Sequence, residues 1–178
     1  MNYISNDASL TQLRDFGFDQ AELEGECLWY DKILCYYFAN DKITPPLVRI
    51  AKAIEQIYAR QPKAIILLSA LRIWPSSHDE LMVDLLFSSI SDTSGLPPDG
   101  TMLNCGVADQ AKVVTLFHSA MLFGWDMTMW LGNPKMQIDI GHHGSIEIYS
   151  RENIDQLSVD FSDLSGGRVL EIRDKARS

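Results

Sequence analysis

The sequence lacks the short motifs that mark the common enzyme classes. It contains no Gly-rich phosphate loop, no GxSxG nucleophile elbow, no HExxH zinc motif and no EF-hand loop. Its three cysteines are odd in number and have no CxxC spacing, which argues against a disulfide framework or a zinc ribbon. Nucleotide-binding, hydrolase and metalloprotease functions therefore lose support, and Cys27, Cys35 and Cys105 are expected to be reduced, partly buried thiols.

Basic charge and long apolar runs are also scarce. The 15 Lys and Arg residues face 24 Asp and Glu residues, which gives a net charge of −9. Such a charge repels DNA, RNA and anionic lipid, so neither nucleic acid nor a membrane is expected as a direct partner. Apolar blocks such as Ala64–Leu68 are too short to span a bilayer, and Met1–Asp7 does not read as a signal peptide. We therefore expect a cytoplasmic protein.

The length and the charge distribution describe the expected organisation. With 178 residues, 46% of them hydrophobic, the chain has enough apolar side chains for one core. We expect a single domain over residues 1–165 and a detachable tail over 166–178, after Ser165-Gly166-Gly167. Residues 45–75 carry five basic side chains and one acid, and this segment is expected to supply internal counter-charge to the acidic remainder.

The strongest folding pattern lies between Ala108 and Ser150. An amphipathic helix over Ala108–Phe123 runs through Gly124-Trp125 into three segments of alternating apolar and polar residues. The segments are Asp126–Leu131, Met136–Gly141 and Ser145–Ser150. Their turns are Gly132–Lys135 and His142–Gly144, both rich in residues that tolerate chain reversal. The pattern predicts a three-stranded antiparallel meander packed under the helix.

Two further helices are predicted from capping and periodicity. Ser5 or Asp7 can cap a helix through Phe16 that Gly17 ends. Thr44 can cap a second helix, which begins with Pro45-Pro46 and is stopped by Pro62. Its apolar residues recur at spacings of three and four: Leu47, Ile50, Ala51, Ile54, Ile57 and Tyr58.

Three apolar segments remain ambiguous. Cys27–Tyr30 and Ile33–Phe38 read as a hairpin, with a helix over Glu22–Tyr37 as the alternative. Ala64–Trp74 and Leu81–Ile90 fit either a strand or a helix. Taken together, the elements predict an α+β fold in which one antiparallel sheet is covered by two or three helices.

Two groups of residues are candidates for chemistry. Asp139, His142 and His143 lie together in sequence and offer half of a metal site, although an exposed hairpin tip is the simpler interpretation. Cys105 precedes a helix that carries His118, yet a small buried cysteine is the more common outcome. The cysteines and the four histidines form no closed set of ligands, so we expect neither a metal nor another cofactor.

A candidate binding surface lies in the N-terminal third. Four carboxylates within eight residues create a negative field suited to a basic partner: Asp19, Glu22, Glu24 and Glu26. The aromatic residues that follow include Trp29 and Tyr30, which can anchor an interface. The alternatives are a solvated acidic face and an aromatic face that a helix covers.

In its size, acidity, low cysteine content and lack of catalytic motifs, the whole chain resembles the immunity proteins of bacterial toxin–immunity pairs, as in contact-dependent inhibition and type VI secretion. The resemblance includes no motif, so it transfers no functional residue. It implies an inhibitor that binds a cognate toxin and occludes its active site. The alternatives are a small enzyme that uses Cys105 or the Asp139/His142/His143 group, and a structural or assembly protein. The sequence leaves the oligomeric state open.

Overall fold

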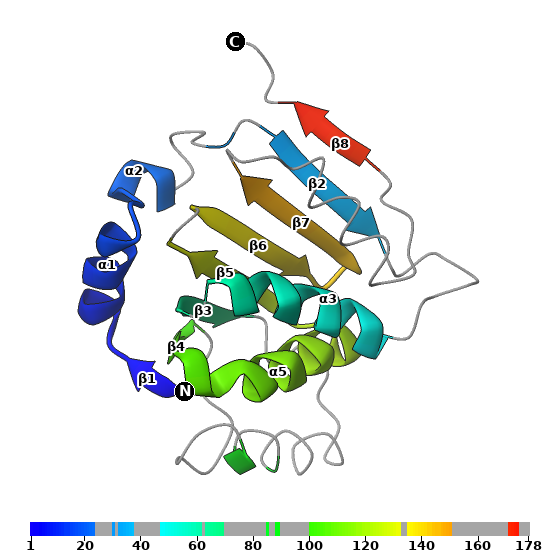
Figure 1. The fold of residues 1–178 in the computed structure, drawn as a ribbon, viewed down its shortest axis with the longest axis horizontal. Coiled ribbons are helices and arrows are strands. Elements are labelled where there is room, and N and C mark those ends of the chain that lie inside the picture. Colours follow the sequence, from blue (N-terminus) through cyan, green and yellow to red (C-terminus); the bar gives the residue numbers. More distant parts are fainter. Residues whose placement is uncertain are drawn as a thin grey trace.

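The fold is known from a computed structural model, which describes residues 1–23, 30, 32–37, 47–61, 63–69, 85, 88–89, 100–132, 135–150 and 171–174. Within these residues the chain is an α+β protein built on one antiparallel sheet, as predicted (Figure 1). The described strands are β1 (Asn2–Ile4), β2 (Lys32–Tyr37), β3 (Ala64–Ser69), β4 (Thr101–Cys105), β5 (Asp126–Leu131), β6 (Met136–Gly141), β7 (Ser145–Ser150) and β8 (Glu171–Asp174). The described helices are α1 (Asn6–Asp15), α2 (Gln20–Leu23), α3 (Leu47–Arg60) and α5 (Gln110–Phe123), with a 3₁₀ turn η1 (Val107–Asp109).

The eight described strands follow the order β1-β4-β3-β5-β6-β7-β2-β8. The predicted meander forms its centre, because β5 pairs with β6 and β6 pairs with β7 through short turns. Gly144 adopts a φ of 82° in the second turn, a left-handed conformation that favours glycine. The bounds of all three meander strands agree with the prediction.

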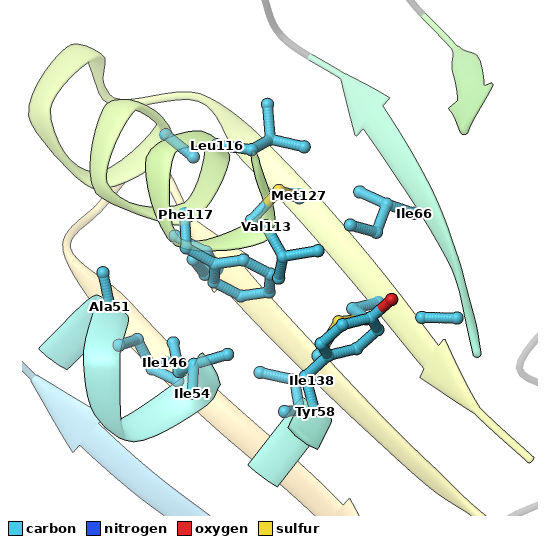
Figure 2. Packing of buried hydrophobic residues seen from close by; sticks show 14 of the residues in the cluster. Ala51, Ile54, Tyr58, Ile66, Val113, Leu116, Phe117, Met127, Ile138 and Ile146 are labelled. Carbon is cyan, nitrogen blue, oxygen red and sulfur yellow. The ribbon is translucent and has the colours of Figure 1, made fainter. Parts of the chain in front are cut away.

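One face of the sheet, called the inner face here, is packed under α3 and α5 (Figure 1). Figure 2 shows Ile54 and Tyr58 of α3 and Phe117 of α5 directed toward Ile138 and Ile146 of the strands. All five side chains are buried. The periodicity of α3 is explained by this contact, since its apolar positions lie on the side that meets the sheet and α5.

The opposite face, called the outer face here, carries a smaller apolar cluster. Leu13 of α1 and Phe18 pack with Ile65 of β3 and Trp130 of β5. Ser5 caps α1 by accepting a hydrogen bond from the Ala8 N–H at 3.3 Å, and the chain leaves the helix through positive φ at Gly17. The predicted first helix is therefore confirmed.

Several ambiguous segments are resolved by the pairing of strands. Residues 32–37 form β2, so the alternative helix through Tyr37 is wrong, while Cys27–Trp29 lie outside the described residues. Ala64–Ser69 form a central strand, which decides that part of Ala64–Trp74. Thr44–Pro46, the rest of Ala64–Trp74 and nearly all of Leu81–Ile90 are not described.

Two expectations about organisation need correction. Glu171–Asp174 form β8 on β2, so part of the predicted tail over 166–178 belongs to the sheet. The expected internal counter-charge of segment 45–75 is wrong for Arg49 and Lys52, which are exposed and form no ion pair with another described residue. For the other three basic residues of the segment it stays a prediction. No helix in the described ranges combines the length and apolarity needed to cross a membrane.

Candidate functional site

Polar side chains occupy the central part of the outer face. Because the strands are in register, Thr128 of β5, Asp139 of β6 and Glu147 of β7 form one row across three neighbouring strands. Gln137 and Tyr149 lie in the next row. These five residues, here called the outer-face cluster, alternate along their strands with buried apolar side chains of the inner face.

A directed chain of hydrogen bonds runs through the cluster. The Trp130 indole Nε1–H donates to Gln137 Oε1 at 3.0 Å, and Gln137 Nε2 donates to Asp139 Oδ2 at 2.9 Å. On the next strand the Tyr149 hydroxyl donates to Glu147 Oε2. The Gln137 side-chain amide thus accepts a hydrogen bond through its oxygen and donates one through its nitrogen. This arrangement fixes the orientation of the Asp139 carboxyl group.

The carboxyl group of Asp139 is only half satisfied. Its Oδ1 atom is buried and has no hydrogen-bond partner, although Oδ2 accepts from Gln137. Burial raises the pKa of Asp139 to about 6 and the facing Glu147 adds to the increase, against hydrogen bonds from Gln137 and Thr128 that lower it. A buried acid with a strongly perturbed pKa is typical of functional sites.

Tyr30 connects this cluster to the predicted binding surface. Its ring meets the Tyr149 ring edge-on, with centroids 4.9 Å apart and planes at 61°. Burial raises the pKa of Tyr149, and so does its hydrogen bond to Glu147. Burial and the nearby Glu147 likewise raise the pKa of Tyr30. Among the predicted anchors, Tyr30 is therefore a half-buried residue packed on the cluster, while Trp29 is not described.

The predicted acidic residues have different roles in the structure. Asp19 and Glu22 form a capping box on α2, in which each side chain accepts the other's backbone N–H at 2.8 Å. Glu22 also binds Lys135, and its side chain is only 8% exposed. Asp19 remains exposed, as do Asp7 and Asp15 of α1. Glu24 and Glu26 lie outside the described residues, so their part in a partner surface stays a prediction.

Lys135 was not identified from the sequence, yet it holds α2 in place. Its ammonium group donates to the Gly17 carbonyl at 2.7 Å and binds Glu22. It also lies 4.6 Å from the centre of the Phe18 ring. A lysine at the end of a hairpin turn gives no local signal for such a contact, because its partners are distant in the sequence.

The two adjacent histidines do not join Asp139. His142 Nδ1 lies 2.8 Å from Asp126 Oδ1, and the His142 backbone N–H donates to the same oxygen at 2.7 Å. The ring centroids of His142 and His143 are 3.8 Å apart. No three potential metal ligands come together among the described residues, so the Asp139/His142/His143 grouping is wrong. The expectation that the protein binds no metal stays a prediction.

The described cysteines are poor candidates for nucleophiles. Cys35 and Cys105 are free thiols with exposures of 1%. Burial raises the pKa of Cys105 to about 12, and Asp109 contributes to that increase. The thiol is therefore protonated and weakly nucleophilic at neutral pH, which argues against an enzyme that uses Cys105.

The cross-strand pairing of Asp139 with Glu147 was not predicted either, although the length of the turn between their strands indicates it. A short turn through His142-His143-Gly144 sets Gly141 opposite Ser145, and counting back in steps of two brings Asp139 opposite Glu147. Alternation alone shows which residues share a face, whereas register shows which of them meet.

No family model matches this chain, and no curated protein and no solved structure matches it.

Proposed function

We propose that the protein is a protein-binding inhibitor of the immunity-protein kind, which neutralises a cognate toxin by covering its active site. The observation that supports this proposal is the acidic surface of α1 and α2. Asp7, Asp15 and Asp19 are exposed there, and they form no ion pair with another described residue. An acidic surface of this kind accelerates association with a basic protein through complementary charge.

The contacts that hold α2 in place make this surface suitable for recognition. Lys135 attaches the short helix to the end of the β5–β6 connection, and Phe18 is buried in the outer-face core. A four-residue helix is not stable by itself, so these contacts determine its position. Acidic groups held in this way need little ordering when a partner binds.

The first test is comparative capture of partners from the native cytoplasm. Tagged wild type is compared with a variant in which Asp15 and Asp19 are changed to Asn. Glu22 is left unchanged because it supports α2. The matched control changes Arg49 and Lys52 to Gln, which removes two exposed charges from α3.

Binding kinetics then separate steering from anchoring. Neutralising the acids should lower the association rate and flatten its salt dependence, since exposed charges act mainly at long range. Truncation of an anchoring aromatic, Trp29→Ala, should chiefly raise the dissociation rate. A captured partner whose binding is unchanged in the acid variant and in Trp29→Ala, both folded, would rule out this surface as the interface.

A further inference from the structure

The outer-face cluster contains two carboxyl groups that face each other, and no described cation pairs with either of them. Asp139 and Glu147 are direct cross-strand partners in β6 and β7. Side chains at such positions have Cβ atoms about 4.5–5.5 Å apart, so like charges oppose each other strongly there. Among the described residues, neither carboxyl group forms an ion pair with Lys, Arg or His.

The remaining groups around Asp139 are neutral or acidic. The titratable groups near Asp139 among the described residues are Glu147 and Tyr149 of β7 and Cys35 of β2, with Tyr30 beside them. Asp126 of β5, which binds His142, lies two residues from Thr128 on the same face. Gln137 and Thr128 complete the surroundings as uncharged donors. This environment therefore makes the ionised carboxylate of Asp139 less favourable than it is in water, because the buried Oδ1 has no hydrogen-bond donor and Glu147 faces it.

We infer that Asp139 binds and releases a proton while the protein stays folded, and that Glu147 and Tyr149 transmit this change of charge to Tyr30. The order of contacts supports the direction of transmission. Ionised Asp139 repels Glu147, which accepts the hydrogen bond of the Tyr149 hydroxyl. Tyr149 in turn contacts the ring of Tyr30. The inference does not depend on a binding partner.

The decisive experiment is a pH titration of the wild-type protein by NMR, with ¹³C labels on the Asp and Glu carboxyl carbons and on the Tyr rings. The Asp139 carboxyl signal should titrate with a midpoint of about 6. The ring signals of Tyr149 and Tyr30 should shift with the same midpoint. Tyr58 of α3 is the internal control. Its side chain is buried in the inner-face core, so its ring signals should not shift with the Asp139 midpoint.

Two variants test the cluster in opposite directions. Glu147→Gln removes the facing charge and should lower the Asp139 midpoint, while burial keeps it above the ordinary range. Gln137→Met removes a donor that stabilises the carboxylate and should raise the midpoint. Asp15→Asn changes an exposed acid of α1 and should leave the midpoint unchanged.

The wild-type titration decides the matter even if a variant fails to fold. An Asp139 midpoint in the ordinary aspartate range of about 4 overturns the inference. A midpoint near 6 without a matching shift at Tyr149 and Tyr30 also overturns it, because the proton would then have no effect beyond its own site. Shared midpoints at Asp139, Tyr149 and Tyr30, with Tyr58 unmoved, establish it.

Discussion

The two faces of the sheet bury side chains in different ways. The inner face is apolar across its centre and is packed under α3 and α5. The outer face combines an apolar part under α1 with the outer-face cluster, in which the Oδ1 atom of Asp139 is buried without a hydrogen-bond partner. Burial at the centre of the inner face thus adds to stability, whereas the outer face includes a carboxyl group whose burial is unfavourable. Such a difference points to function on the outer face, because stability alone does not explain it.

The largest expected effect comes from opening a cavity under the inner face. Phe117→Ala removes a ring that is 0% exposed and packs in the inner-face core. We expect the free energy of unfolding to fall by about 3–5 kcal/mol. Chemical denaturation monitored by tryptophan fluorescence measures this loss. Leu122→Ala, on the same helix but 57% exposed, is the control and should change stability by about 0.5 kcal/mol or less.

The opposite sign is expected for Asp139→Asn on the outer face. The folded-state pKa of Asp139 is raised to about 6, so its contribution to stability is complete below the unfolded pKa and is lost as pH rises through about 6. The variant lacks this loss and should be more stable than wild type by about 1–3 kcal/mol at pH 7.5, with little difference at pH 4. Urea unfolding at both pH values provides the measurement. A variant that is less stable at pH 7.5 would contradict the contrast between the faces.

A smaller loss is expected when the support of α2 is removed. Lys135→Ala leaves Glu22, which is 8% exposed, without its cation. We expect a loss of about 1–2 kcal/mol, below that of a fully buried pair because the Lys135 side chain is 18% exposed. Amide hydrogen exchange should quicken in Phe18–Leu23 and not in α5. Lys112→Ala is the control, since Lys112 is 40% exposed and lies 3.9 Å from Asp109.

The smallest effects are expected at the His142 turn. His142→Ala removes an exposed pair with Asp126 and should cost about 0.5 kcal/mol or less. Asp126→Ala also removes the acceptor of the His142 backbone N–H and should cost about 1 kcal/mol. Thermal unfolding of the two variants at pH 7 gives the comparison. Equal losses would show that the backbone contact contributes nothing.

An element was predictable from the sequence where its signals are local and was not predictable where it depends on distant partners. The meander was predicted to the residue because alternation and turn residues are local signals, as in Met136–Gly141 followed by Gly144. The strands β1, β4 and β8 were missed, since each is short and is defined by partners far away in the sequence. Within the candidate site, alternation separated Asp139 from Ile138, while its facing of Glu147 required the register.

The strand order also has a consequence for the route by which the chain folds. Residues 110–150 hold α5 and the meander in one continuous stretch, and the contacts of β5, β6 and β7 with one another close only short loops. The strands at the two edges, β1 and β8, join partners that are far away in the sequence. Closing a long loop costs more entropy before any contact repays it, so local contacts form sooner. We therefore expect the central segment to become protected against hydrogen exchange early during refolding, and β1 and β8 to be protected last.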